Sequence, residues 1–286
     1  MDIRNVGVIG AGTMGNGIAQ VFAMNGRSVV LVDVDQGYLD RATANMTKSV
    51  RKMAEKGGKD PAAAEADLKT KVRTTTDLES LAGVDLAIEA IIEQKDVKLE
   101  LFRKLDRICP PAAILASNTS SISLTVIAAA TKRPEKVIGM HFMNPVPIMK
   151  LVEIIRGHRT SDETSKIIVE CSKSLGKTPV EANDYPGFVA NRILMPMINE
   201  ACFALMEGVS TRDGIDEIMK LGCNHPMGPL ALADFIGLDV CVSILDVLHQ
   251  GLGDPKYRAC PLLRRRVAAG QLGKKSGRGF YDYAAV

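Results

Sequence analysis

The chain has no tryptophan, few aromatic residues and no closely spaced pair of cysteines. The low aromatic content decides little, because hydrophobic residues make up 46% of the 286 residues, enough for the core of one large domain or two ordinary ones. The six cysteines are scattered, with no CxxC spacing. This pattern argues against a disulfide framework and against a zinc site, so we expect no bound metal and a reducing compartment.

The sequence also lacks a strong charge of either sign and a long apolar run. The net charge is +3, and no basic tract carries interleaved aromatic residues, so no nucleic-acid partner is expected. No apolar run approaches the length that spans a bilayer. Structure-forming residues begin at Ile3, which leaves no room for a signal or transit peptide. We therefore expect a cytoplasmic protein with no membrane partner.

A glycine-rich turn near the start of the chain lies between two apolar runs. Residues 6–9 lead into Gly10-Ala11-Gly12-Thr13-Met14-Gly15, a helical stretch follows, and residues 28–32 end at Asp33. This order is the βαβ fingerprint of dinucleotide binding. Gly10 permits the tight turn, Gly12 lets the backbone approach a pyrophosphate, and Gly15 lets the helix pack close to the strand.

Asp33 and the start of the helix predict which dinucleotide binds. The helix amino terminus, with Thr13 and Met14 in the loop, supplies amide donors and a favourable dipole for phosphates. Asp33 is placed to accept hydrogen bonds from the ribose hydroxyls, and its carboxylate would repel a 2′-phosphate. The sequence therefore favours NAD over NADP. A glycine-rich turn in another kind of α/β protein is the alternative.

Two helices in succession interrupt the expected alternation of strands and helices. Residues 36–56 form the first helix, Gly57-Gly58 breaks it, and residues 62–71 form the second. Three lysines at four-residue intervals, with Ser49 nearby, lie along one face of the first helix: Lys48, Lys52 and Lys56. This face could hold the phosphates of a second ligand such as coenzyme A. A solvated surface face is the simpler explanation from the residues alone.

Polar side chains follow the next two predicted strands. Residues 84–92 form a strand followed by Glu93 and by a helix, residues 95–109, that carries Lys98. Residues 113–116 run into the cluster Ser117-Asn118-Thr119-Ser120-Ser121. The carboxyl ends of parallel strands face the ligand crevice, so both groups can reach a cofactor or substrate. Helix capping is the competing explanation.

A histidine and a carboxylate lie in the next pair of apolar runs. Residues 137–140 end at His141, and residues 151–155 have Glu153 at their centre. A carboxylate in a buried strand is costly unless it is paired, and the histidine is the simplest partner. Such a pair holds one imidazole tautomer and makes the other ring nitrogen a general base or acid. A buried structural pair is the alternative.

The composition changes at Asn183-Asp184-Tyr185-Pro186-Gly187, and we expect the segments beyond it to be helical. The predicted helices cover residues 188–207, with a kink at Pro196, residues 213–221 and residues 230–247. We predict an α/β Rossmann-type domain over residues 1–183, with a mostly parallel sheet and the helical hairpin as an insertion. An all-α domain for substrate binding and dimerisation follows over residues 184–286. The wide apolar surface of its first helix predicts a homodimer.

Six motifs occur together and in order: the glycine fingerprint, SNTSS, HFMNPVP, Glu153 twelve residues after His141, PGFVANR and GKKSGRGFY. On these motifs the chain resembles the 3-hydroxyacyl-CoA dehydrogenase family over nearly its whole length, and most of all the short bacterial members that act on 3-hydroxybutyryl-CoA. The resemblance implies interconversion of 3-hydroxybutyryl-CoA and acetoacetyl-CoA with NAD(H), in fatty acid and butanoate metabolism.

The resemblance also implies roles for individual residues. His141 is the catalytic base, Glu153 orients it, and Ser120 and Asn191 hold the substrate oxygen. The implied cofactor contacts are Gly10, Gly12, Thr13, Met14, Gly15, Asp33, Glu93, Lys98, Ser120 and Asn144. The implied substrate contacts are Ser49, Lys52, Lys56, Ser120 and Asn191, and the C-terminal helices form the dimer. Two alternatives are a non-catalytic, crystallin-like NAD-binding protein and a dehydrogenase of free hydroxyacids, which would need a cationic clamp for the carboxylate.

Overall fold

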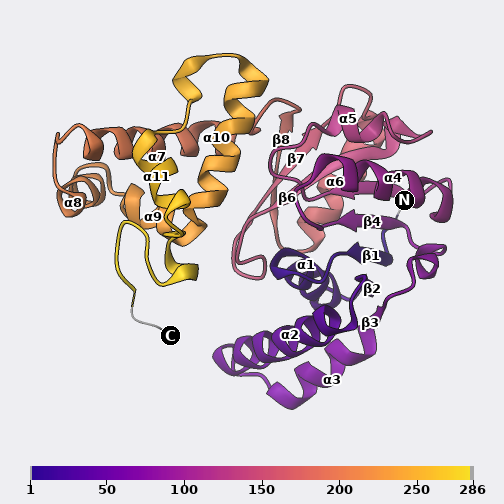
Figure 1. The fold of residues 1–286 in the computed structure, drawn as a ribbon. Coiled ribbons are helices and arrows are strands. Elements are labelled where there is room, and N and C mark those ends of the chain that lie inside the picture. Colours follow the sequence, from indigo (N-terminus) through magenta and orange to yellow (C-terminus); the bar gives the residue numbers. More distant parts are fainter. Residues whose placement is uncertain (1, 284–286) are drawn as a thin grey trace. The chain divides into compact units, whose positions relative to one another are not determined.

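The computed structural model describes residues 2–283, and the chain divides into two compact units between Asp184 and Tyr185. The first unit is an α/β structure built on a single sheet, and the second consists of helices and a short C-terminal tail (Figure 1). The predicted fold class, a Rossmann-type sheet with a helical hairpin insertion followed by an all-α region, is confirmed.

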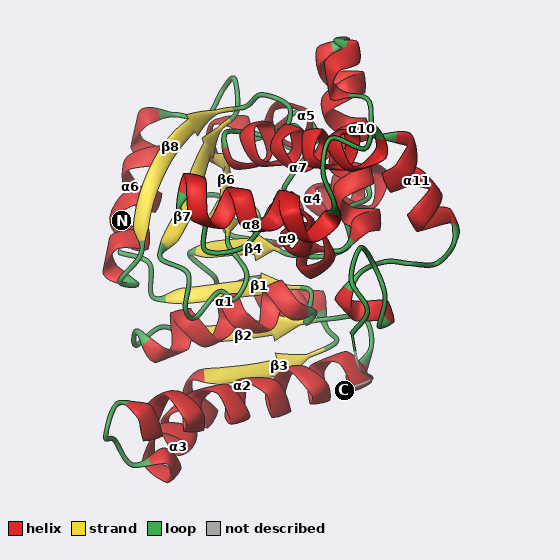
Figure 2. Ribbon diagram, turned by 90° about the vertical axis from the view of Figure 1, so that its left-hand side faces the viewer, coloured by secondary structure: helices red, strands yellow, loops and turns green. Residues whose placement is uncertain are grey.

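The sheet has eight strands in the order β3-β2-β1-β4-β5-β6-β7-β8 (Figure 2). Strands β1 to β6 run parallel, β7 runs antiparallel to β6, and β8 runs parallel to β7. The strands are β1 Asn5–Ile9, β2 Ser28–Val32, β3 Val72–Thr75, β4 Leu86–Glu89, β5 Ile114–Ser117, β6 Val137–Phe142, β7 Leu151–Arg156 and β8 Thr178–Asn183. The first six have the 3-2-1-4-5-6 order of dinucleotide-binding folds, in which the strand order reverses between β1 and β4.

Helices cover both faces of the sheet because the central strands are apolar on both sides. One continuous core joins alternate residues of the strands to α1 (Thr13–Met24), α2 (Gln36–Lys56), α3 (Pro61–Lys71) and α6 (Asp162–Ser174). The helices α4 (Lys95–Ile108) and α5 (Leu124–Ala128) pack on β5 and β6 outside this core, and thus on the other face. The central strands of the sheet are buried between the two helical layers.

Helices α2 and α3 form the predicted hairpin, which extends beyond the β3 edge of the sheet (Figures 1 and 2). Asp35 caps α2 by accepting a hydrogen bond from the Tyr38 amide, and Asp60 caps α3 by accepting one from the Ala62 amide. The chain then returns as β3, a strand that the sequence analysis did not predict. Its sequence, Val-Arg-Thr-Thr, is polar because the strand lies at the edge of the sheet.

Two of the differences from the predicted element boundaries in this unit bear on the site. The strand predicted over residues 84–92 covers only Leu86–Glu89, because the Ile91 amide donates to the Glu89 carboxylate, 2.8 Å away, and not to a neighbouring strand. The strand predicted to end at His141 continues by one residue, through Phe142, because β7 pairs with it there. As a result, His141 lies inside a paired strand.

The second unit packs five helices around its own apolar core: α7 (Ala190–Met206), α8 (Arg212–Cys223), α9 (Pro229–Ile236), α10 (Leu238–Leu252) and α11 (Pro261–Ala268). Pro196 lies inside α7, as expected. The single helix predicted over residues 230–247 is wrong. The chain breaks at Gly237, whose φ of +107° is incompatible with a helix, so α9 and α10 are separate.

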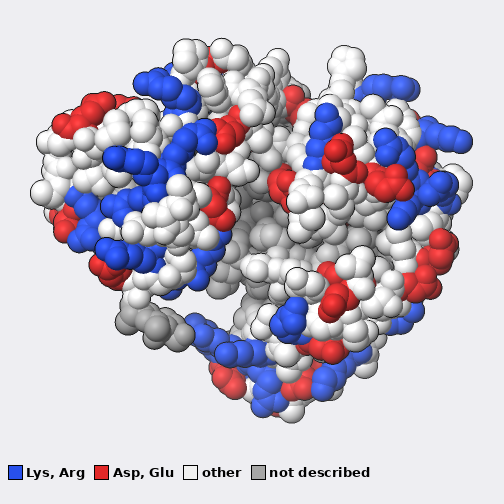
Figure 3. Space-filling model, in the orientation of Figure 1, with Lys and Arg blue, Asp and Glu red and all other residues white. Residues whose placement is uncertain are grey.

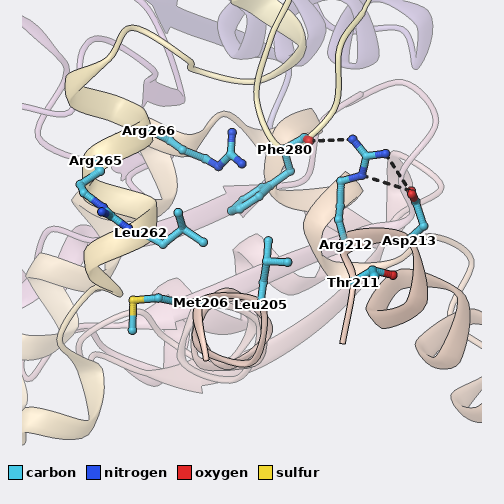
Figure 4. Close-up of a pocket in the computed structure, with 9 residues that line it drawn as sticks. All are labelled: Leu205, Met206, Thr211, Arg212, Asp213, Leu262, Arg265, Arg266 and Phe280. Carbon is cyan, nitrogen blue, oxygen red and sulfur yellow. Dashed lines mark hydrogen bonds and ion pairs between the residues drawn. The ribbon is translucent and has the colours of Figure 1, made fainter. Parts of the chain in front are cut away.

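Two buried aspartates fix the C-terminal tail to this unit. Asp234 accepts hydrogen bonds from the amides of Phe280 and Tyr281, both at 2.8 Å, and Asp216 accepts one from the Tyr281 hydroxyl at 2.8 Å. Arg212 donates to the Phe280 carbonyl oxygen, and both residues line a cavity beside α11 (Figure 4). Nothing within residues 2–283 forms a helix that is both long and apolar enough to cross a membrane.

Candidate active site

Five predicted site residues of the first unit lie at one edge of its sheet. Gly10 follows β1, Asp33 follows β2, Glu93 follows β4, Ser120 follows β5, and His141 is the second-last residue of β6. These strands are parallel, so their carboxyl ends lie along the same edge. The edge includes the point between β1 and β4 where the strand order reverses, which is where such sheets bind ligands.

The glycine loop has the close packing that its sequence predicts. Gly10 has φ +103°, and a side chain there would bring its Cβ to 2.5 Å from the Ala90 carbonyl oxygen. A Cβ on Gly15 would overlap the Gly10 carbonyl oxygen, so only glycine lets α1 start this close to β1. Gly12 is the exposed N-cap residue of α1 and has no side chain to cap it. The loop therefore presents backbone amides at a helix amino terminus, an arrangement suited to a pyrophosphate.

Asp33 closes this loop from the end of β2. Its Oδ2 accepts a hydrogen bond from the Ala11 amide at 2.6 Å, and the side chain is partly exposed. The carboxylate thus both holds the glycine loop and borders the predicted dinucleotide site. Thr13 and Met14, also predicted to contact the cofactor, occupy the first turn of α1.

His141 and Glu153 face each other across the antiparallel pair β6–β7. They are direct register partners, and His141 Nδ1 lies 2.7 Å from Glu153 Oε2. Both side chains are buried, with about a tenth of the imidazole still accessible. Since a carboxylate accepts only, Nδ1 carries a proton toward Glu153, and Nε2 is the ring nitrogen that can exchange a proton with a ligand.

The loop that carries Ser120 is gathered around one oxygen of Glu93. Glu93 Oε1 accepts hydrogen bonds from the Thr119 hydroxyl at 2.5 Å, from the Ser120 and Ser121 amides at 2.9 and 3.0 Å, and from the Ser121 hydroxyl at 2.9 Å. Asn118 ties the same loop to β6, because its side-chain oxygen accepts from the Phe142 amide at 2.9 Å. The position of Ser120 relative to His141 is thus set by side chains of the loop and of Glu93.

Lys98 and Glu89 form a buried ion pair behind Glu93. Lys98 is 1% exposed and bonds to Glu89 Oε1, while its ammonium also lies 3.1 Å from Glu93 Oε2. Burial raises the pKa of Glu89, and Lys98 opposes that shift. Burial also acts to raise the pKa of Glu93, but Lys98 and the loop hydroxyls outweigh it and lower that pKa. Lys98, predicted to contact the cofactor, is thus surrounded by these two carboxylates.

The loop over residues 143–150 joins β6 to β7 and contains Asn144, another predicted cofactor contact. Asn144 is exposed. The Lys177 ammonium donates to the carbonyl oxygens of Val146 and Met149 at 2.5 and 2.8 Å, which fixes the middle of the loop, and burial lowers the pKa of Lys177. A Cβ on Gly17 would lie 2.9 Å from Val146, so the loop packs directly against α1.

The predicted coenzyme A contacts lie on α2, away from the His–Glu pair in sequence. Lys52 and Lys56 are exposed on one face, and Figure 3 shows basic side chains gathered with acidic ones on the hairpin surface at the bottom of the view. Ser49 is partly buried and accepts a hydrogen bond from Gln20 of α1 at 3.0 Å. Asn191 belongs to the helical unit, where it is the second residue of α7 and is 8% exposed.

Sequence reasoning missed three polar residues that organise this edge: Glu89, Ser117 as a hydrogen-bonding partner, and Lys177. A signal for Glu89 was present, because it ends the apolar run Leu-Ala-Ile-Glu just as Glu153 interrupts a buried strand. The argument that a buried carboxylate needs a partner applies to both residues. No comparable pattern marks Lys177, whose partners are backbone carbonyls.

The doubly wound sheet, the glycine loop and the histidine–carboxylate pair together define an NAD-binding dehydrogenase of the Rossmann class. Comparison with known families makes this specific: the NAD binding domain of 3-hydroxyacyl-CoA dehydrogenase matches residues 5–185, and the C-terminal domain of the same family matches residues 187–283. The chain belongs to the 3-hydroxyacyl-CoA dehydrogenase family, and the predictions of that family and of NAD are confirmed.

Individual relatives cover nearly the whole chain. A probable 3-hydroxybutyryl-CoA dehydrogenase of Deinococcus radiodurans is 59% identical over 97% of this chain and 99% of its own length. The 3-hydroxybutyryl-CoA dehydrogenase of Clostridioides difficile is 52% identical over 96% and 98%. The crystal structure of (S)-3-hydroxybutyryl-CoA dehydrogenase from Ralstonia eutropha is 48% identical, with a TM-score of 0.95 over 99% of this chain and all of that one.

Proposed function

We propose that the protein interconverts 3-hydroxybutyryl-CoA and acetoacetyl-CoA with NAD(H), as a 3-hydroxybutyryl-CoA dehydrogenase of fatty acid and butanoate metabolism. The observation that carries this proposal is the His141–Glu153 contact of 2.7 Å at the strand edge that also holds the glycine loop. The names of the relatives support the substrate, since those at 52% to 59% identity are 3-hydroxybutyryl-CoA dehydrogenases.

The glycine loop and α1 fit a dinucleotide. Gly10 and Gly15 can be replaced by no larger residue without a clash, so the backbone turn that presents the amides is built into the packing. The pyrophosphate would lie at these amides and the adenosine ribose near Asp33. When bound, the nicotinamide takes up or supplies the hydride.

His141 moves the proton in this proposal. In the oxidation it accepts the proton of the 3-hydroxyl group at Nε2, and in the reduction it returns that proton to the oxygen. Glu153 keeps the Nδ1 proton in place and stabilises the imidazolium that forms. Ser120, from the Glu93-bound loop, donates to the substrate oxygen, where negative charge develops. The family resemblance implies that Asn191 also holds this oxygen and helps to position His141.

The remaining contacts follow the same resemblance. Ser49, Lys52 and Lys56 would bind the phosphate-bearing part of coenzyme A on α2. The helical unit would form a homodimer. The six cysteines are free, which supports the predicted location in the reducing cytoplasm. A crystallin-like protein without activity has less support, because the His–Glu pair has the geometry of a proton-transfer site.

The proposal is tested by the oxidation of NADH with acetoacetyl-CoA, followed by NADH absorbance, for the wild type and for His141→Gln. We expect the substitution to lower kcat by about 10²- to 10⁴-fold, the usual contribution of a general acid–base residue. NADH affinity, measured by fluorescence titration, should stay nearly unchanged, since the cofactor binds to other residues.

Two controls separate the alternatives. His158→Gln changes an exposed histidine in a turn and should leave kcat unchanged. Free acetoacetate should be a poor substrate if coenzyme A is recognised, and a good one if the protein acts on free hydroxyacids. Activity of His141→Gln within tenfold of the wild type would refute the assignment of the base. A wild type that binds NADH but reduces neither substrate would favour the non-catalytic alternative.

A further inference from the structure

Five side chains form a closed ring of polar contacts at the ends of β4 and β5. Glu89 bonds to Lys98, Lys98 lies 3.1 Å from Glu93, and Glu93 accepts from Thr119 at 2.5 Å. Ser117 completes the ring, because its hydroxyl donates to Glu89 Oε2 at 2.6 Å and accepts from the Thr119 amide at 3.1 Å. We call this set of residues the Glu89 ring.

Two chains of contacts in the Glu89 ring lead from Glu89 to the loop that carries Ser120. One branch runs from Glu89 through Lys98 to Glu93, which accepts from the Ser120 amide at 2.9 Å. The other runs from Glu89 through Ser117 to the Thr119 amide, one residue before Ser120. Glu89 is therefore linked to the loop through two separate routes.

Donor groups surround the buried carboxyl group of Glu89. Its side chain has no exposure, and its three partners, the Lys98 ammonium, the Ser117 hydroxyl and the Ile91 amide, are all donors to it. These three donors favour the carboxylate form and so oppose burial, which raises the pKa of Glu89. Burying an ion pair gives little net stability compared with apolar residues of the same size. Stability alone is thus a weak reason for a buried ion pair at this place, next to the loop of the proton-transfer site.

We propose that Glu89 is a positioning residue, which acts through Lys98 and Glu93 to hold Ser120 in the geometry needed for turnover. Lys98 is then a member of the same unit, and its side chain is 1% exposed. The inference rests on the proposed function, because turnover is its main readout. It goes beyond that function by assigning a role to a residue that does not reach the substrate.

The test uses Glu89→Gln and the double variant Glu89→Gln/Lys98→Met, which removes the ion pair without leaving one buried charge alone. Both nearly keep the volume of the side chains, and the oxygen of the introduced amide can still accept from Ser117. We expect kcat with acetoacetyl-CoA and NADH to fall at least fivefold in both variants, while both KM values change less than twofold in Glu89→Gln. Hydrogen–deuterium exchange should rise at the amides of residues 119–121, which the ring holds, and stay unchanged in β4 and β5.

Asp106→Asn is the matched control. Asp106 lies near the other end of α4, with a side chain 9% exposed and 2.8 Å from Arg133, so this substitution also removes a nearly buried ion pair from the same helix. It should lower the unfolding temperature without changing kcat. A fall in kcat below fivefold in the double variant, or an equal fall in the control, would overturn the inference. A large rise in the KM for NADH alone would show instead that Lys98 contacts the cofactor.

Ser117→Ala provides a milder variant if the double variant does not fold. It breaks one of the two routes to the loop, so kcat should fall about two- to threefold, with raised exchange at Thr119. No change in either quantity would count against the ring. Failure of the proposed function can be told apart from failure of this inference. In the first case the wild type itself would not reduce acetoacetyl-CoA, and the exchange experiment would still report whether the Glu89 ring holds the loop.

Discussion

Three acidic residues near the carboxyl ends of the parallel strands accept hydrogen bonds from different donors. The donor indicates the role of each carboxylate. Glu153 accepts from His141, Glu93 accepts from loop amides and hydroxyls, and Asp33 accepts from the Ala11 amide. Only Asp33 combines partial exposure with a place at the glycine loop. The Asp33 charge is thus the one that would distinguish NADP, which has a 2′-phosphate, from NAD, which lacks it.

Asp33→Asn should narrow the preference for NADH over NADPH. The amide oxygen can still accept from the Ala11 amide, so the glycine loop keeps its support, but the repulsion of a 2′-phosphate is lost. We expect the ratio of kcat/KM for the two cofactors to fall by about tenfold or more, equal to about 1.4 kcal/mol. The measurement is a pair of initial-rate series with acetoacetyl-CoA at saturation.

Asp33→Ala separates the two roles of this side chain. It removes both the charge and the hydrogen bond to Ala11, which is 2.6 Å long. Affinity for both cofactors should therefore fall, while the ratio between them resembles that of Asp33→Asn. An unchanged cofactor ratio in both variants would contradict the idea that the Asp33 charge selects NAD.

At the scale of elements, the α2–α3 hairpin is a part of the first unit that the dinucleotide fold does not require. Arg51 of α2 pairs with Glu65 of α3 at 2.8 Å, which joins the two helices, and Ser49 accepts from Gln20 of α1. These contacts occupy one side of α2 and leave Lys52 and Lys56 exposed. The lysines thus form a basic face that can bind a phosphate group.

Lys52→Glu/Lys56→Glu should raise the KM for acetoacetyl-CoA by about tenfold and leave kcat and the KM for NADH unchanged. Exposed charge pairs contribute up to about 1 kcal/mol each, and two reversals bring the total effect to about the 1.4 kcal/mol that corresponds to tenfold. Steady-state kinetics at low ionic strength give the measurement, since salt weakens the effect.

Two comparisons identify what the basic face binds. Acetoacetyl-pantetheine lacks the nucleotide phosphates, so its KM should be the same for the wild type and the double variant. Lys104→Glu reverses an exposed charge on α4 and should not change the KM for acetoacetyl-CoA. A rise in KM for acetoacetyl-pantetheine as well would mean that the substitutions disturb α2 and do not act through phosphate binding.

Elements with a strong pattern could be predicted from the sequence, and those defined by tertiary contacts could not. The α2 helix was predicted at the observed bounds, Gln36–Lys56, because an apolar stripe runs along it and glycines end it. Strand β3 has four mostly polar residues and exists because β2 offers it an edge. The break at Gly237 was missed because a single glycine in an apolar stretch does not show its φ.

The same distinction holds for the site. The His141–Glu153 contact was predictable because a lone carboxylate in a buried apolar run is costly unless it is paired. The observed antiparallel register places the two side chains opposite each other. The Glu89 ring was not predicted, although the Glu89 side chain gave the same signal. Its members come from two strand ends, a helix and a loop, and only the fold brings them together.

At the scale of the whole molecule, apolar exposure is concentrated in the smaller unit. Ten of the 19 large hydrophobic residues that are exposed belong to residues 185–283, although this part is little more than a third of the described chain. On α8, Ile218 and Leu221 are 62% and 78% exposed and lie three residues apart, hence on one face. An exposed apolar patch of this kind is typical of a protein interface.

We predict a homodimer that buries this face of α8, measured by sedimentation equilibrium at micromolar protein concentration. Burial of a large apolar side chain contributes about 1.5–3 kcal/mol, so Ile218→Glu/Leu221→Glu should weaken association by at least about 3 kcal/mol per protomer. Because both protomers carry the substitutions, the total of about 6 kcal/mol corresponds to about 10⁴-fold in the dissociation constant and should give a monomer. Val180→Glu is the control, because Val180 is 50% exposed on β8, the edge strand of the sheet. A dimer that survives the α8 substitutions but dissociates with Val180→Glu would place the interface at the sheet edge, and a monomeric wild type would contradict the dimer itself.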